Sequence, residues 1–326
     1  MGRPRIRPVL WTPPVAPARS RATTGTRPLP PLRRIELPGA GPEDVLVAPS
    51  GEAYTGLADG RILRVDADAT RIETIADTGG RPLGLEWLPD GTLLVCDAYR
   101  GLLRVAGQSV EVLSEGHVFC NNAAVAPDGT VYFSDSSTRF GVDNWRADLI
   151  EHSATGRLLV RTPGGKVETL LSGLAMANGV ALTPDGSAVL VAETGAYRIT
   201  RLWLSGPRAG SSDTFVDNLP GFPDNISTGT DGLIWVTQAS RRDAALDRLL
   251  PRSPALRQLV WALPQRLQPQ PQRTVWVLAY RPDGTLVHDL QGPGTHYHLV
   301  TGVREHHGRV WLGSLTETAL AHLTLR

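Results

Sequence analysis

The sequence predicts an all-β protein, a six-bladed β-propeller with four-stranded blades and an N-terminal extended arm. Three observations predict this fold. A glycine-centred turn motif recurs six times, each copy opens a run rich in Val, Leu, Tyr and Trp, and the glycines are separated by 40, 38, 57, 46 and 76 residues. Such intervals fit blades of four short strands once insertions are allowed. The glycines are Gly51, Gly91, Gly129, Gly186, Gly232 and Gly308.

Alternating hairpins follow the glycine motifs along the chain. In residues 61–76, 102–113, 157–171 and 275–290, apolar and polar side chains alternate on both sides of a short turn, as in RILRVDADATRIETIA. This alternation is typical of half-buried antiparallel strands. We therefore expect these runs to form the outer strands of the blades.

The beginning of the chain and one internal segment depart from the repeat. Residues 1–34 hold eight arginines, eight prolines and no acidic residue, which predicts a basic extended arm. The propeller is expected over residues 35–326, with an insertion at about 240–272 that holds a short helix and a loop rather than a seventh blade. The run LRRIEL at 32–37 is placed to pair with the last blade, which closes the ring and removes its exposed edges.

The composition argues against several classes of function. The net charge is +1, so neither nucleic acid nor a membrane is expected as a partner. Prolines interrupt the apolar part of the arm, which argues against a secretory or transit peptide, and no stretch reaches transmembrane length, so a cytoplasmic location is expected. Cys96 and Cys120 fit no disulfide framework and no metal-binding spacing. The oligomeric state stays open.

A ring of oxygen-bearing side chains is the clearest functional signal. The residues eight positions before the six glycines are Glu43, Leu83, Asn121, Asn178, Asp224 and Val300. Four of the six carry a hard oxygen donor, and equivalent positions before the innermost strands of a propeller converge on its central channel. Two carboxylates and two amides, with Asn225 as a possible fifth ligand, suit Ca²⁺ better than Zn²⁺, which prefers nitrogen and sulfur.

At these residues the chain resembles the strictosidine synthase-like branch of the gluconolactonase, paraoxonase and diisopropylfluorophosphatase superfamily of six-bladed propellers. The strings that carry the resemblance run from about residue 41 to residue 315 and include RPLGLEWLPDGTLLVCDAYRGLLRV, DGTVYFSDSSTRF, MANGVALTPDG and NLPGFPDNIS. The resemblance implies one catalytic calcium. The residues that match its ligands are Glu43, Asn121, Asn178, Asp224 and Asn225.

Three positions depart from the pattern of these relatives. Strictosidine synthase carries its catalytic glutamate where this chain has Thr301, which argues against the Pictet–Spengler condensation. Paraoxonases carry a histidine where this chain has Leu83. Asn122 stands where many relatives have an aspartate, which weakens the case for a second, structural calcium beside Asp44.

The ring and the resemblance together favour a calcium-dependent hydrolase of lactones or aryl esters that acts on a small-molecule substrate. The resemblance implies that Asp224 is the base or nucleophile, and the alternative is that it is only a metal ligand. His298 stands two residues before the ring position and is the candidate proton shuttle, with a solvated loop histidine as the alternative. Two other functions stay open: a condensing enzyme of the strictosidine synthase type, and a propeller that binds a ligand without chemistry.

A few other side chains are candidates for supporting roles. Trp87, Phe119, Trp145 and Phe222 are candidates for the wall of a substrate pocket, with a core position favoured for Trp87. Asp135 and Arg139, in the string SDSSTRF, are expected to hold blade edges together through hydrogen bonds and an ion pair. No GxSxG motif occurs, which argues against a serine hydrolase.

Overall fold

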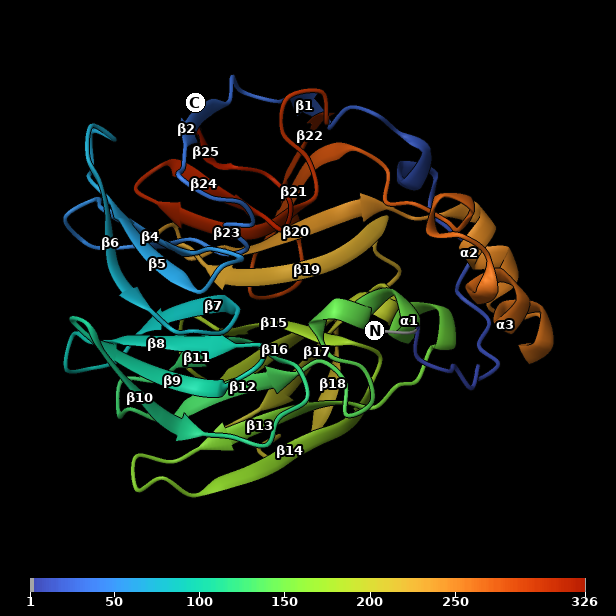
Figure 1. Ribbon diagram of the computed structural model, residues 1–326, viewed down its shortest axis with the longest axis horizontal. Coiled ribbons are helices and arrows are strands. Elements are labelled where there is room, and N and C mark those ends of the chain that lie inside the picture. Colours follow the sequence, from blue (N-terminus) through green and yellow to red (C-terminus); the bar gives the residue numbers. More distant parts are fainter. Residues whose placement is uncertain (1–2, 326) are drawn as a thin grey trace.

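The computed structural model describes residues 3–325 and confirms the six-bladed propeller (Figure 1). Each blade is a separate sheet, and its innermost strand is the one that packs against the innermost strands of the neighbouring blades. Blade 1 contains β3 (Leu46–Val47), β4 (Ala53–Gly56), β5 (Arg61–Val65) and β6 (Ile72–Asp77). Blade 2 contains β7 (Pro82–Trp87), β8 (Leu93–Asp97), β9 (Gly101–Ala106) and β10 (Ser109–Ser114). Blade 3 contains β11 (Cys120–Val125), β12 (Val131–Asp135), β13 (Gly156–Arg161) and β14 (Val167–Leu174).

The second half of the ring has the same plan. Blade 4 contains β15 (Ala177–Leu182), β16 (Ala188–Glu193), β17 (Arg198–Trp203) and β18 (Ser212–Val216). Blade 5 contains β19 (Gly221–Thr228), β20 (Ile234–Arg241), β21 (Thr274–Tyr280) and β22 (Leu286–Pro293). Blade 6 contains β23 (Val300–His306), β24 (Arg309–Ser314), β25 (Ala319–Thr324) and, from the beginning of the chain, β2 (Arg33–Glu36).

The repeated glycine motif forms a tight turn between two strands. In the string PDGT at 89–92, Gly91 has a φ of 79° and its N–H donates to the carbonyl of Leu88 (2.9 Å). Asp90 Oδ1 accepts from the N–H of Thr92 (3.0 Å), which fixes the end of the turn. Glycine takes this left-handed conformation without the steric cost that other residues incur. The same string at 282–285 joins β21 to β22, neither of which is the innermost strand of blade 5. The string therefore marks a hairpin, but not always the hairpin that contains the innermost strand.

The N-terminal arm packs along the propeller before it enters the ring. Ile6 is buried in a core cluster that also holds Ile150 and Leu246, and η1 (Ala18–Arg21) follows. Next, β1 (Arg27–Pro28) pairs in parallel with β22 and becomes a fifth strand of blade 5. Finally β2 pairs antiparallel with β25, so strands from the two ends of the chain complete blade 6, which confirms the predicted closure.

Helical segments gather on one side of the propeller (Figure 1). Between β12 and β13 lie η2 (Val142–Asn144) and α1 (Trp145–Glu151), and η3 (Thr194–Ala196) follows β16. The segment expected as an insertion holds α2 (Ala244–Leu249), α3 (Pro254–Ala262) and η4 (Gln265–Leu267). Among the helices of residues 3–325, none has the length and apolarity needed to span a bilayer.

Asp135 and Arg139, which were expected to hold blade edges together, each form an ion pair, but only the pair of Asp135 joins two strands of a blade. Asp135 pairs with Arg157 (2.6 Å) on the neighbouring strand of blade 3, and it also accepts from the N–H of Phe119 (2.8 Å). Arg139 pairs with Glu151 of α1 (2.6 Å). Asp135 and Arg139 are therefore structural, but they do not pair with each other.

Candidate metal centre and active site

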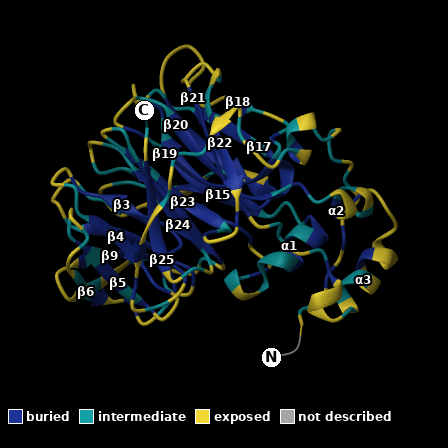
Figure 2. Cartoon of the chain, turned by 90° about the horizontal axis from the view of Figure 1, so that it is seen from above, coloured by how far each residue is buried: buried dark blue, intermediate teal, exposed yellow. Residues whose placement is uncertain are grey.

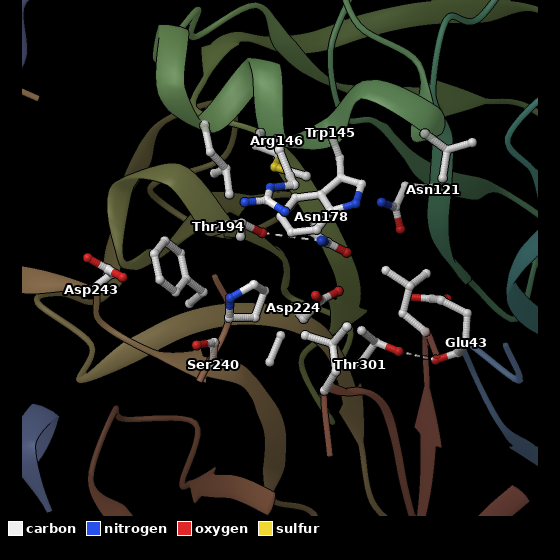
Figure 3. A pocket seen from close by; sticks show the side chains of 18 of the residues that line it. Glu43, Asn121, Trp145, Arg146, Asn178, Thr194, Asp224, Ser240, Asp243 and Thr301 are labelled. Carbon is white, nitrogen blue, oxygen red and sulfur yellow. Dashed lines mark hydrogen bonds between the residues drawn. The ribbon is translucent and has the colours of Figure 1, made fainter. Parts of the chain in front are cut away.

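A mostly apolar cavity lies above the residues that begin the inner strands (Figure 3). Its space is about 960 Å³ when the open mouth is included. A concave, largely apolar site with a few polar groups is the usual form of a small-molecule site. The apolar lining residues are Leu83, Phe119, Val142, Trp145, Leu149, Ile150, Met176, Phe222, Ala239, Leu246, Pro269, Pro271, Leu299 and Leu315.

In five of the six blades, an irregularity in the pairing of the inner strand accompanies a side chain that lines the cavity. In blade 3 the pairing of β11 with β12 skips from Cys120 to Ala123, and the corresponding skip follows Pro82, Ala177, Pro223 and Val300 in the other blades. The residue after each of these positions lines the cavity. With Glu43, which precedes β3, these residues form the ring: Glu43, Leu83, Asn121, Asn178, Asp224 and Thr301.

The structure brings five of the six positions obtained by counting back from the glycines together around one cavity, and it replaces the sixth, Val300, by Thr301. Thr301 lines the cavity, whereas Val300 is the last paired residue before the skip. The hairpin of blade 6 has a shorter turn, in which His306 pairs with Arg309, so its glycine lies seven residues after the ring position instead of eight. The Thr301 hydroxyl donates to the carbonyl of Glu43 (2.7 Å), which leaves it no acid–base role.

The two ring amides are held by hydroxyl groups that fix which end faces the cavity. Asn121 Nδ2 donates to Ser136 Oγ (2.9 Å), and Asn178 Nδ2 donates to Thr194 Oγ1 (3.2 Å). Asn225, next to the ring, donates from Nδ2 to the carboxylate of Glu43 (3.1 Å). The nitrogen end of each amide is therefore committed to the protein.

The oxygen ends of the same three amides have no such partner. Oδ1 of Asn121, of Asn178 and of Asn225 is buried and accepts no hydrogen bond from the residues that the structure describes. Leaving a buried carbonyl oxygen unpaired costs about 1–3 kcal/mol, so three in one place indicate a ligand. A single cation is a ligand that all three oxygen atoms can bind at once.

The two ring carboxylates add negative charge beside these oxygens. Glu43 and Asp224 are 4% and 9% exposed. Burial raises the pKa of Asp224 to about 7, although the Asn178 amide partly offsets the rise. Burial also raises the pKa of Glu43 well above its usual range, and the charges of Asp224 and Asp44 raise it further. A cation bound by both carboxylates relieves this desolvation and repulsion.

The donor set fits Ca²⁺ rather than zinc. Within residues 3–325, no three His, Cys, Asp or Glu side chains cluster as a nitrogen- or sulfur-rich site requires. The ring instead offers amide and carboxylate oxygens from Glu43, Asn121, Asn178 and Asp224, with Asn225 beside them. Calcium takes six to eight such oxygens, water included, in flexible geometry.

Hydrogen bonds within the protein occupy Asp44 and Asn122, the groups next to the ring that a second calcium would need. Asp44 Oδ2 accepts from the N–H of Leu85 (3.2 Å), and Asn122 Oδ1 accepts from the N–H of Val180 (2.9 Å). Burial raises the pKa of Asp44 to about 6, although the charge of the half-buried Arg304 guanidinium partly offsets the rise. These contacts argue against a second cation there.

His298 lies apart from this centre. Its Nδ1 is 2.5 Å from Glu317 Oε1, and both residues line an outer depression that shares part of its wall with the cavity. The structure does not bring His298 to the cavity that Asp224 lines, although the following residue, Leu299, does line it. The predicted proton-shuttle role of His298 therefore receives no support from the geometry.

The cavity walls contain three of the four candidate aromatic residues. Phe119, Trp145 and Phe222 line the cavity, whereas Trp87 packs edge-on against Tyr54 with ring centroids 5.0 Å apart. Arg146 of α1, which the sequence analysis missed, donates to Gln270 Oε1 (3.1 Å) and so links α1 to the insertion at the mouth.

Ser136 and Thr194 were also missed, although the sequence contains a signal for them. Each follows the acidic residue that ends the second strand of its blade, in SDS and AET, and each lies in a blade whose ring residue is asparagine. In blade 2, where the ring residue is Leu83, the corresponding string is CDA and offers no hydroxyl.

Comparison with known proteins identifies the family of the chain. The family model described as strictosidine synthase matches residues 121–207, and the one described as strictosidine synthase-like, N-terminal, matches residues 29–65. An adipocyte plasma membrane-associated protein from Salmo salar is 36% identical over 322 residues, which cover 87% of this chain and 77% of that protein. Protein STRICTOSIDINE SYNTHASE-LIKE 10 from Arabidopsis thaliana is 34% identical over 325 residues, covering 88% and 86%.

Solved structures share the fold at low sequence identity. A gluconolactonase from Xanthomonas campestris has a TM-score of 0.65 at 16% identity, with 99% of each chain covered. A calcium-binding protein from Agrobacterium tumefaciens, regucalcin, has a TM-score of 0.64 at 16% identity, with 91% of this chain and 94% of that chain covered. These structures, at low identity, show only that the fold is shared. The relatives of higher identity show the family, and the chain belongs to the strictosidine synthase-like family.

Proposed function

We propose that the protein is a calcium-dependent hydrolase of lactones or aryl esters. The observation that carries the proposal is the set of three buried amide oxygens without partners beside two buried carboxylates, at the base of an apolar cavity. Glu43, Asn121, Asn178, Asp224 and Asn225 would hold the cation. When bound, Ca²⁺ supplies Lewis-acid polarisation of a substrate carbonyl oxygen.

The residues around the cation would position the substrate and take up a proton. Asp224 lines the cavity at the ring, where its carboxylate is the candidate general base for a water molecule. It is also the better candidate nucleophile, because the side-chain amide of Asn225 donates to both oxygens of Glu43 (3.1 and 3.3 Å). Phe119, Trp145 and Phe222 give an aryl or acyl group apolar surface and exclude water.

The cavity does not favour the condensation performed by strictosidine synthase. The glutamate of that enzyme corresponds to Thr301, whose hydroxyl is bonded to the Glu43 carbonyl (2.7 Å). The remaining acidic residue of the cavity wall is Asp243, which caps α2 and lies on the side of the cavity opposite Glu43 (Figure 3).

A hydrolysis assay with a panel of aryl esters and lactones tests the proposal. We expect activity with calcium, loss of activity with chelator, and a fall of about 10²–10⁴-fold in kcat/KM for Asp224→Asn. Asp243→Asn is the matched control, since asparagine also caps helices and Asp243 lies away from the ring. Calcium binding with no turnover of the panel would instead support a propeller that binds a ligand without chemistry.

A further inference from the structure

Two segments without acidic residues meet on one side of the molecule. Residues 1–35 carry eight arginines and residues 248–282 carry six, and neither segment contains Asp or Glu. The whole chain has 33 basic and 32 acidic side chains, so the rest of the chain has an excess of acidic residues. The net charge of +1 therefore conceals a strong separation of charge.

Hydrogen bonds hold the first of these segments against α3 in the second. Trp261 Nε1 donates to the carbonyl of Pro4 (2.8 Å), and Gln258 Nε2 donates to the carbonyl of Ile6 (3.2 Å). The guanidinium of Arg257 donates to the carbonyl of Val9 (2.6 Å). The arm and α3 therefore form one surface, which we call the arm–helix face and define as residues 3–10 and 248–267.

Helix α3 buries its one charged side chain and exposes two leucines. Arg257 is fully buried, where its guanidinium also donates to the carbonyls of Ile150 and Glu151 (both 3.2 Å). Leu256 and Leu259 are instead 43% and 62% exposed. A surface helix ordinarily turns its apolar side inward and its charged side outward, so the outer side of α3 is suited to an apolar partner.

The arm and the segment after α3 also contain exposed apolar side chains. Leu10 of the arm is 62% exposed and Leu267 of η4 is 61% exposed, and α3 appears mostly in the colour of exposed residues (Figure 2). Exposed arginines lie along the same two segments. They are Arg3, Arg5, Arg7, Arg248, Arg252 and Arg266.

We propose that the arm–helix face docks on the surface of an anionic lipid bilayer. The exposed leucines would enter the boundary between headgroups and acyl chains, and the arginines would contact headgroup phosphates. This proposal replaces the expectation, based on net charge alone, that the protein has no membrane partner. It is independent of the proposed hydrolysis.

Charge and side-chain chemistry favour a lipid bilayer over a second copy of the chain or a nucleic acid as the partner of the arm–helix face. A second copy of the chain that met this face with its own would bring arginines against arginines. Single-stranded nucleic acid would satisfy the arginines, but it is bound through exposed aromatic side chains, whereas those exposed here are leucines. Only a lipid surface offers phosphates and an apolar layer together.

Co-sedimentation of the full chain with vesicles tests the proposal. Vesicles of phosphatidylcholine alone are compared with vesicles that also contain phosphatidylserine, at low and at physiological salt. We expect binding to the anionic vesicles that weakens with salt, and a loss of about tenfold or more in affinity for Leu256→Gln/Leu259→Gln and for Arg248→Gln/Arg252→Gln. These residues are exposed, and melting curves check that the variants fold.

A matched double variant lies on other parts of the propeller. Val112 and Leu286 are 40% and 45% exposed, and Val112→Gln/Leu286→Gln should bind vesicles like the parent chain. The proposal is overturned if anionic vesicles do not sediment the protein, or if the control loses as much affinity as the leucine variant. Binding to a single-stranded RNA that is unaffected by the leucine substitutions, without vesicle binding, would assign the face to nucleic acid and also overturn it.

Discussion

At the scale of single residues, the centre depends on groups that orient its ligands as much as on the ligands themselves. An asparagine amide presents either its oxygen or its nitrogen, and only the oxygen binds a cation. Ser136 and Thr194 accept hydrogen bonds from the amide nitrogens of Asn121 and Asn178, so the oxygens face the other way. The hydroxyl partners therefore set which end of each amide is available to a cation.

Removing one hydroxyl should weaken calcium binding without removing a ligand. We expect Ser136→Ala to lower the affinity for Ca²⁺ by about 10–100-fold, measured by isothermal titration calorimetry, because the Asn121 amide loses the bond that fixes it. Ser134→Ala is the control, because that equally buried hydroxyl bonds the main chain of Asn122 instead. Equal losses in the two variants would contradict the orienting role.

A second residue-scale prediction concerns His152, which ends α1. Its ring stacks on Trp11 of the arm, with centroids 4.2 Å apart. Burial, aided by the charge of Arg257, lowers its pKa to about 4. Between pH 4 and pH 6.5 the unfolded chain binds the proton and the folded chain does not, so the free energy of unfolding falls as the pH drops through this range.

Urea denaturation at several pH values checks this dependence. The contribution of His152 is on the order of 1–3 kcal/mol, present above pH 6.5 and lost toward pH 4. His152→Asn removes the titration while keeping a residue that tolerates the positive φ of 55°. The variant should lose less stability between pH 7 and pH 5 than the parent chain, and parallel curves would contradict the assignment.

At the scale of elements, close packing of the inner strands sets the geometry of the ring. The position after the ring residue alternates around the channel between a side chain and glycine: Asp44, Gly84, Asn122, Gly179, Asn225 and Gly302. A Cβ added to Gly179 would lie 2.2 Å from the main-chain nitrogen of Ile226 and 2.5 Å from Asn225 Cα. Each glycine therefore admits the inner strand of the next blade.

Gly179→Ala should consequently separate β15 from β19. We expect it to destabilise the fold by about 1–3 kcal/mol, because both nearest atoms belong to backbone that cannot rotate away. It should also weaken calcium binding, since Asn178 and Asn225 flank the displaced contact. Gly164→Ala, in an open turn whose nearest atom is 3.9 Å away, is the control for both chemical denaturation and calorimetry.

The same packing explains how far the sequence predicted the centre. Glu43, Asn121, Asn178 and Asp224 were found because hairpins of equal length keep a constant spacing to their glycines. The shorter hairpin of blade 6 does not keep this spacing, so counting back eight residues from its glycine gave Val300 instead of Thr301. The walls were found only in part, because Arg146 and Pro269 reach the cavity through long-range packing of α1 and the insertion, which has no local period.

At the scale of the whole molecule, the ligands connect parts of the chain that are far apart in sequence. They come from the segment before β3 and from β11, β15 and β19, which belong to four different blades. A cation bound to all of them crosslinks the ring on its axis, while β2 and β25 close it at its edge. Metal binding should therefore stabilise the complete propeller and not one blade.

Thermal melting measures this coupling. A ligand at 100 times its Kd stabilises the folded state by about 2.7 kcal/mol, which for a chain of this size raises Tm by about 4 °C. Asn178→Leu should melt at the same temperature with calcium as with chelator, because it removes one oxygen. Leucine is sterically acceptable, since Leu83 occupies the equivalent position in blade 2, and the Thr194 hydroxyl keeps its bond to the Pro223 carbonyl (2.7 Å).

Magnesium is the control ion for this measurement. It requires a compact octahedral shell and gives up its waters reluctantly, so a wide ring of amide and carboxylate oxygens should prefer calcium. A rise in Tm that was as large with Mg²⁺ as with Ca²⁺, or that persisted in Asn178→Leu, would mean that the ions act through surface charge. A rise that requires both calcium and Asn178 ties the stability of all six blades to the ring on their axis.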